Sequence, residues 1–221
     1  MKRNCSLEDI SDGKLYGIED LVEASCNGCK GAAVCCHGMG SSIILDPHDI
    51  YRLTTDLNKS FEELLTDRIE LHVVDGIILP NLRMVGEEES CAFLDRSGKC
   101  SIHTSRPGIC RIFPLGRYYD KHDFHYFLQQ NECNHNSRTK VKVRKWIDTP
   151  DFEENKSFLL DWHYFLNDAE EIVKTAQDDQ LVKNLNMYIL SNFYVRPYSR
   201  ENGFYDQFYV RLNEAKKIIC Q

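Results

Sequence analysis

The sequence predicts an α+β fold, in which an irregular cysteine-rich segment of short helices and β-hairpins is followed by an α-helical C-terminal region. Three observations support this prediction. Eight of the ten cysteines lie between Cys26 and Cys133. Short apolar runs in the same part of the chain flank Asp- and Gly-containing turns, which is typical of β-hairpins. Beyond residue 138, apolar residues recur at spacings of three and four, which is typical of amphipathic helices.

Short helices are expected at three places in the first third of the chain. Weak apolar spacing predicts one that ends just before Cys26, with Leu15, Ile18, Leu21 and Val22 on its face. Residues 41–46 (SSIILD) are expected to form a buried strand. Asp46 and Pro47 then begin the second helix, with Asp46 as the N-cap. A capping box from Ser60 to Glu63 begins the third, which we expect to extend to about Leu71.

Three hairpins are expected between residues 72 and 133. The Asp75-Gly76 step lies between β-branched residues and is a strong turn signal. Residues 89–103 form the second hairpin, with its turn at residues 95–98 and with Cys91 and Cys100 on opposite arms. Cys110 follows in a turn or short helix. The third hairpin turns around residues 120–123, and its second arm leads to Cys133.

Three helices are predicted in the C-terminal region. The first begins at Thr149-Pro150 and the others begin near Asp179 and Gly203. We expect their aromatic residues to pack in a core rather than to bind a cofactor. The apolar stripe of the first is Phe152, Phe158, Leu159, Trp162, Phe165, Leu166, Ala169, Ile172 and Val173. The expected organisation is an N-terminal segment (1–23), a cysteine-rich domain (24–137) and a helical region (138–221) packed on it.

Charge and hydropathy exclude several classes of protein. The formal net charge of -7 argues against general nucleic-acid binding, because phosphate neutralisation requires a basic face. No apolar run approaches the ~18–20 residues of a membrane span. The N-terminal residues MKRNCSLEDISDG contain no apolar segment typical of a secretory signal. We therefore expect a cytoplasmic protein that binds neither nucleic acid nor membrane.

The cysteines are then best interpreted as metal ligands or redox groups, because disulfides are rare in a reducing cytosol. A disulfide framework is the alternative if the chain is exported. Cys26 and Cys29 form a C-x2-C knuckle, which suits one metal. The adjacent pair Cys35-Cys36 diverges in most backbone conformations, and therefore favours two metals or two corners of a polynuclear cluster. The spacing of ferredoxins and that of radical S-adenosylmethionine enzymes are both absent.

Several basic residues and histidines accompany these cysteines. Lys30, Lys99, Arg106, Arg111 and Arg117 could compensate the thiolate charge, or could simply be surface residues. His37, His103 and His135 each lie within three residues of a cysteine. With eight cysteines available, we expect these histidines to lie beside the ligands more often than among them. No catalytic triad, phosphate-binding loop or dinucleotide-binding motif stands out.

A basic run from Arg138 to Lys145 opens the C-terminal region. It could contact an acidic protein partner, and residues 138–221 as a whole could form the docking surface. The alternative interpretation, a solvated linker, is favoured for the run itself.

The motifs together resemble a known family. C-x2-C-x5-C-C, the C-A-F-L segment and I-H-T-S-R-P-G-I-C-R-I-F-P are similar to the YkgJ-type cysteine-cluster proteins, which carry a zinc- or iron-chelating CxxCxxCC domain. The resemblance covers about residues 24–135. The gap before the cysteine pair is five residues here rather than two, and His103 stands where relatives often have Tyr.

The resemblance implies metal or iron–sulfur binding with a defined ligand set. The implied ligands are Cys26, Cys29, Cys35, Cys36, Cys91, Cys100, Cys110 and Cys133. The favoured hypothesis is an iron–sulfur protein, with a 4Fe-4S cluster or clusters, that serves in electron transfer or in a modifying enzyme. A zinc protein with two four-cysteine sites is the alternative. A third is an S-adenosylmethionine-dependent protein lysine methyltransferase, since one branch resembles the cysteine region of flagellin lysine N-methylases.

Overall fold

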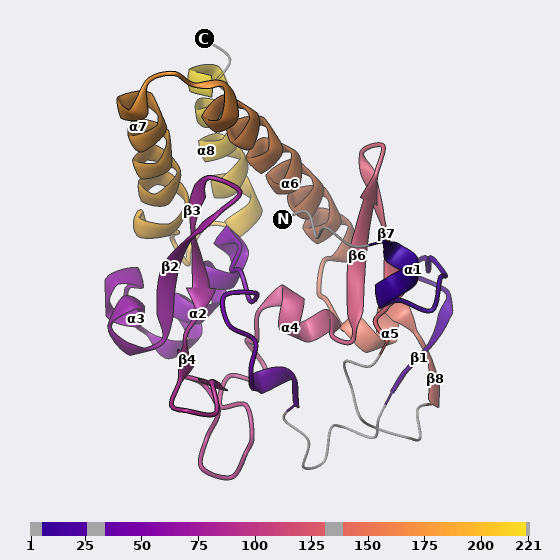
Figure 1. Ribbon diagram of the computed structural model, residues 1–221. Helices are drawn as coiled ribbons and strands as arrows, with labels where there is room; N and C mark the ends of the chain where they lie inside the picture. Colours follow the sequence, from indigo (N-terminus) through magenta and orange to yellow (C-terminus); the bar gives the residue numbers. More distant parts are fainter. Residues whose placement is uncertain (1–5, 26–33, 131–138, 220–221) are drawn as a thin grey trace. The chain divides into compact units, whose positions relative to one another are not determined.

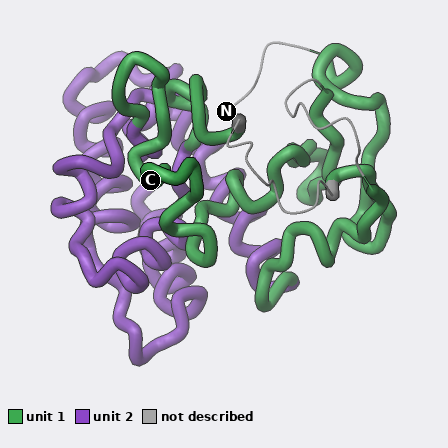
Figure 2. The backbone as a smooth tube through the Cα atoms, turned by 90° about the horizontal axis from the view of Figure 1, so that it is seen from below, with its two compact units in different colours: residues 1–43, 84–152 green, residues 44–83, 153–221 purple. Residues whose placement is uncertain are grey.

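The computed structural model describes residues 6–25, 34–130 and 139–219, and it confirms the α+β fold (Figure 1). Backbone contacts divide the chain into two compact units, each built from two separate segments (Figure 2). Unit 1 comprises Met1–Ile43 and Met84–Phe152, and unit 2 comprises Ile44–Arg83 and Glu153–Gln221. This division differs from the expected boundaries, because Ile44–Arg83 groups with the C-terminal helices. None of the described helices is long and apolar enough to cross a membrane.

Unit 1 is built from short elements. Its helices are α1 (Leu7–Ile10), a 3-10 turn (Val34–Cys36), α4 (Gly108–Ile112) and α5 (Val143–Ile147). Its strands are β1 (Leu21–Ser25), β4 (Met84–Val85), β5 (Ser90–Cys91), β6 (Leu115–Asp120), β7 (Asp123–Leu128) and β8 (Thr139–Lys142). The strands form three antiparallel pairs, β1–β8, β4–β5 and β6–β7. The expected third hairpin is therefore confirmed as β6–β7, with Asp120 opposite Asp123.

One expectation within unit 1 is wrong, and another is confirmed only in part. The segment before residue 24 ends in strand β1 rather than in a helix, because exposed Leu21 and Glu23 alternate with buried Val22 and Ala24. That period of two suits a strand packed on one face, and β8 supplies the pairing partner.

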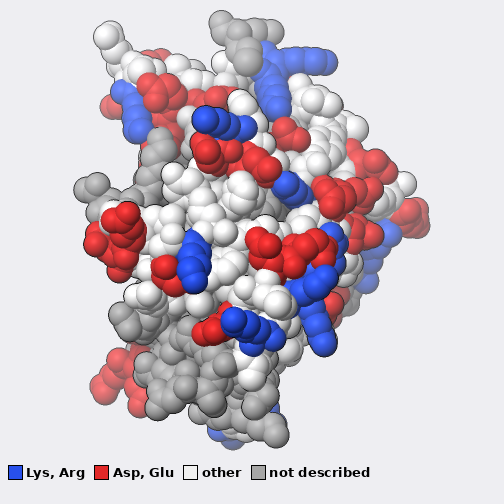
Figure 3. All heavy atoms as spheres, turned by 90° about the vertical axis from the view of Figure 1, so that its right-hand side faces the viewer, with Lys and Arg blue, Asp and Glu red and all other residues white. Residues whose placement is uncertain are grey.

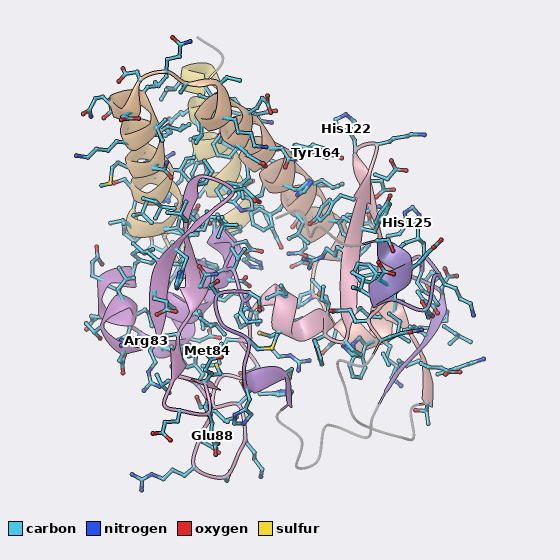
Figure 4. All side chains as sticks on the ribbon, in the orientation of Figure 1. Arg83, Met84, Glu88, His122, His125 and Tyr164 are labelled. Carbon is cyan, nitrogen blue, oxygen red and sulfur yellow. The ribbon has the colours of Figure 1, made fainter. Side chains whose placement is uncertain are left out.

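The second expected hairpin is confirmed in part, at its turn and at the positions next to the turn. Cys91 pairs with Met84 across β4–β5, and Met84 is labelled in Figure 4. The two arms at 89–103 share one bridge, between Leu94 and Cys100. The Asp95 turn is present, since the Gly98 N–H donates to Asp95 O at 3.0 Å. Local turn chemistry thus forms as predicted, while the strand next to Cys91 takes a different partner. The predicted short helix around Cys110 is confirmed as α4.

Unit 2 contains most of the long helices. Its elements are α2 (Pro47–Leu57), α3 (Phe61–Asp67), β2 (Ile69–Val74), β3 (Ile77–Leu82), α6 (Phe152–Thr175), α7 (Asp179–Leu190), a π-helical turn (Ser191–Val195) and α8 (Phe204–Ile219). The predicted N-cap at Asp46 and the predicted capping box at Ser60 are both confirmed. The α3 helix ends at Asp67, before Leu71, because Ile69 already begins the hairpin strand β2.

The Asp75-Gly76 hairpin is confirmed, with left-handed backbone at both turn residues (φ 52° and 85°). The outer side of β3 is held in place by two other segments. The Ile78 N–H donates to Asn186 Oδ1 on α7 at 2.6 Å, and the Leu45 N–H donates to Pro80 O at 2.8 Å. Residues 41–46 therefore contribute one bridge, Ile44 to Asn81, rather than a full strand.

An aromatic core fills unit 2. Phe158 and Phe208 lie 4.7 Å apart between ring centroids, and Trp162 and Phe193 lie 4.9 Å apart. Phe165 is also buried in this cluster. The expectation that the aromatic stripes form a packed core is confirmed.

Candidate metal site

The cysteine pair lies on the 3-10 turn Val34–Cys36 in unit 1, and both side chains are half-buried. A hydrogen bond from the Cys36 thiol to the Cys35 sulfur, assisted by the positive charge of Arg106, lowers the pKa of Cys35 to about 7. The pKa of Cys36 is raised by that same hydrogen bond, by burial and by the nearby Cys35. One member of the pair is therefore available as a thiolate near neutral pH, which is the form that binds metals.

Backbone pairing brings Cys91 to this turn. His37 and Ser90 form an antiparallel bridge, and the Gly38 N–H donates to Glu89 O at 3.0 Å. Because antiparallel partners keep a constant sum of residue numbers, this register sets Cys36 opposite Cys91. Cys91 is only 7% exposed. Its charge raises the pKa of Cys36, which is the effect expected of neighbouring thiols.

Cys100 joins the same group from the loop after β5. Its bridge to Leu94 and the bond from the Ser101 N–H to Phe93 O (2.9 Å) fold the loop back toward Cys91. Burial raises the pKa of Cys100, and the nearby Cys35 raises it further. Cys35, Cys36, Cys91 and Cys100 are thus near enough to influence one another electrostatically. We call these four residues the thiol cluster.

Arg106 is the cation of the thiol cluster. Its positive charge helps to lower the pKa of Cys35 and opposes the rise in the pKa of Cys100. Its Nη1 donates to His103 Nε2 at 3.3 Å. The pKa of His103 is lowered by burial and by the positive charges of Arg106 and Arg111, which disfavours protonation of the ring. Arg111 binds backbone carbonyl groups instead: it donates to Thr104 O at 2.8 Å and to Asp148 O at 3.0 Å. The two arginines, which the sequence does not distinguish, therefore differ in their roles.

Ser90 contacts a residue next to the cysteine pair, and the sequence does not predict this contact. Its Oγ lies 3.0 Å from His37 Nδ1, within hydrogen-bonding distance, so this ring nitrogen is engaged beside the cysteine pair. No local signal could reveal this contact, because the two residues are 53 positions apart.

The remaining predicted ligands are placed only in part. Cys110 lies on α4 and is half-buried. Cys26, Cys29 and Cys133 lie outside the described residues, as do His135 and the isolated Cys5 and Cys220. None of the five described cysteines is in a disulfide. Among residues 6–25, 34–130 and 139–219, no group of three or more His, Cys, Asp or Glu side chains is arranged to hold a metal ion by itself. The donor chemistry of the thiol cluster fits a metal, and the other predicted cysteines would have to complete the site.

Three residues of the basic run from Arg138 to Lys145 form ion pairs with glutamates of unit 1. Lys142 and Arg144 contact Glu19 at 3.2 and 2.6 Å, and Lys140 lies 4.0 Å from Glu23. Figure 3 shows acidic and basic side chains interspersed on the face that it presents. The described residues of this run thus form strand β8 and helix α5 rather than a linker.

A family model matches residues 25–143, and its description is "CxxCxxCC: Putative zinc- or iron-chelating domain". The match covers more than half of the chain, which therefore belongs to this cysteine-cluster family. No curated protein and no solved structure matches the chain. Membership supports metal binding, and it agrees with the resemblance on which the eight-cysteine ligand set is based.

Proposed function

We propose that this chain binds an iron–sulfur cluster through cysteine thiolates, with the thiol cluster of Cys35, Cys36, Cys91 and Cys100 as the centre of the ligand set. The observation that carries the proposal is the register that sets Cys36 opposite Cys91, next to a Cys35 whose pKa is lowered to about 7. Cys26, Cys29, Cys110 and Cys133 would supply the other ligands. When bound, such a cluster supplies one-electron transfer, either to a partner or within a modifying enzyme.

The protein's own groups would prepare the site for a polynuclear centre. Several thiolates held together repel one another, and Arg106 offsets part of that charge from beside Cys35 and Cys100. The half-buried environment of the cysteine pair limits access of water to the sulfurs. The positive charge of Arg106 and the burial of the sulfurs would both change the reduction potential of a thiolate-bound cluster. The residues around the thiol cluster would therefore help to set that potential.

The test is metal and acid-labile sulfide content after purification without oxygen. Iron with a matching amount of sulfide, together with a paramagnetic signal after reduction with dithionite, is the expected result. Zinc at about two per chain without sulfide would overturn the proposal and identify two closed four-cysteine sites instead. Ligand type alone does not separate the two metals, because thiolates suit both.

Variants test the ligand assignment separately. Cys36→Ser should lower the metal content and destabilise unit 1, because it removes a thiolate from the centre of the thiol cluster. Cys5→Ser and Cys220→Ser are matched controls outside the predicted ligand set, and they should retain both metal and melting temperature. Equal metal content in all three variants would contradict the assignment of Cys36.

A further inference from the structure

The two edges of the β2–β3 hairpin in unit 2 differ in whether their outward backbone groups form hydrogen bonds with other segments. On β3, the outward N–H of Ile78 donates to Asn186 and the outward C=O of Pro80 accepts from Leu45. Asn186 Nδ2 also donates to Gly76 O at 3.1 Å, at the hairpin turn. This edge is therefore closed by other parts of the same unit.

The register of the hairpin fixes which groups point outward from β2. Val74 and Ile77 flank a two-residue turn and form a hydrogen-bonded pair, so His72 with Leu79 forms the next such pair. Leu71 and Val73 occupy the intervening positions, and their N–H and C=O groups point away from β3. Ile78 and Pro80 lie opposite Val73 and Leu71, and both form hydrogen bonds on the outer side of β3. These bonds independently confirm which residues of the hairpin have outward-pointing backbone groups.

The outward positions on β2 also carry exposed apolar side chains. Ile69, at the start of the strand, is fully buried, while Leu71 is 38% exposed and Val73 is 71% exposed. Among the described residues, no hydrogen bond joins the backbone of Leu71 or Val73 to a segment other than β3. An open strand edge with apolar side chains is a template for pairing with another strand.

The chemistry of this edge is complementary to itself. Outward groups must meet outward groups, so an antiparallel copy of β2 can pair only with odd residues opposite odd residues. The register centred on His72 sets Leu71 opposite Val73 of the second copy, and Val73 opposite Leu71 of the second copy. Continued by one residue at each end, this register also places Arg68, which forms an ion pair with Asp67 at 3.2 Å, beside the second copy's turn, which carries Asp75. Registers centred nearer Ile69 are blocked, because that residue is fully buried.

We propose that the chain forms a symmetric dimer through antiparallel pairing of β2 with β2 of a second copy, about a two-fold axis at His72. The pairing joins two hairpins into a four-stranded sheet, and on one face Ile78, Val73 and Leu71 and Pro80 of the second copy make a continuous apolar strip. The inference goes beyond metal binding and does not depend on it, because β2 lies in the other unit from the thiol cluster.

Sedimentation velocity of the full-length protein, over a range of concentrations, tests the dimer and its register. Leu71→Lys and Val73→Glu should each weaken dimerisation at least about tenfold, because each places two unpaired charges in the symmetric interface. The double variant Leu71→Lys/Val73→Glu sets opposite charges across the two-fold axis and should recover most of the loss. The like-charged double variant Leu71→Glu/Val73→Glu should stay monomeric.

Controls separate this result from unfolding and from loss of metal. Val210→Lys changes an apolar residue on α8 whose exposed fraction, 57%, lies between those of Leu71 and Val73, and it should leave dimerisation unchanged. Circular dichroism and metal content should match the unsubstituted protein in every variant. A monomer at all concentrations would overturn the proposal, and so would a dimer that is insensitive to both single changes. Failure of the opposite-charge double variant to recover would overturn the register and the proposed interface with it.

Discussion

The two units of this protein differ in the number of large side chains that they bury and in the number of cysteines that they contain. Of the twelve largest side chains that are less than 2% exposed among the described residues, eleven lie in unit 2 and one, Leu115, lies in unit 1. All five described cysteines lie in unit 1. The difference teaches that unit 2 has a core sufficient for an ordinary domain, whereas unit 1 combines a smaller core with groups suited to metal binding.

The largest expected difference between the two units concerns their response to removal of the metal. If ligands hold unit 1 together, chelation should strongly increase amide hydrogen exchange in residues 84–130 and leave α6 and α8 protected. Structural metal sites in small domains can contribute on the order of 10 kcal/mol, so the expected contrast is large. Peptide-resolved exchange mass spectrometry measures it. An equal increase in both units would contradict the division of roles.

A core substitution in unit 2 should show the reverse behaviour. Phe208→Ala removes a ring that is packed against Phe158, Phe193 and Trp162, and should lower the free energy of unfolding by about 3–5 kcal/mol. Urea denaturation measures this loss. Metal content should stay unchanged, and loss of metal in a variant that is still folded would show that the two units are not independent in stability.

The third prediction concerns the contact that closes the β3 edge. Asn186→Ala removes the acceptor for the Ile78 N–H and the donor to Gly76 O, and should destabilise unit 2 by about 1–3 kcal/mol. Gln180→Ala, an exposed site on the same helix, is the control and should have little effect. Chemical denaturation compares the two, and equal stabilities would show that the buried amide contributes nothing.

The parts of the fold that sequence could predict are those that neighbouring residues determine. Asp46 and Ser60 cap the helices that they precede, and Asp75-Gly76 forms its turn from the backbone preferences of two residues. Apolar spacing in the C-terminal region likewise determines which helix faces are buried, because each helix carries its full pattern within itself.

Contacts between distant segments could not be predicted in this way. Strand β1 depends on β8, which lies more than a hundred residues further along the chain, so its short apolar pattern looked equally compatible with a helix. The His37–Ser90 bridge that sets Cys36 opposite Cys91 has the same character. The cysteine spacing and the family resemblance identified the candidate ligands, but the choice of neighbours within the thiol cluster required the structure.

The smallest expected effect lies in the charge pairs of unit 1. Arg144 and Lys142 hold the pKa of the Glu19 carboxyl below its ordinary value by hydrogen bonding, and all three side chains are exposed to water. A carboxyl whose pKa is depressed in the folded state adds stability above its unfolded pKa, and that stability is lost as the pH falls through the folded pKa. Solvent screening makes the contribution small.

Glu19→Gln should therefore lower the stability of unit 1 only slightly at neutral pH and not at all in strong acid. High salt should reduce the difference further, because exposed charges are screened. Thermal unfolding at two pH values and two salt concentrations checks both statements. A large loss that persists in high salt would mean that the β1–β8 ribbon relies on this carboxylate far more than its exposure indicates.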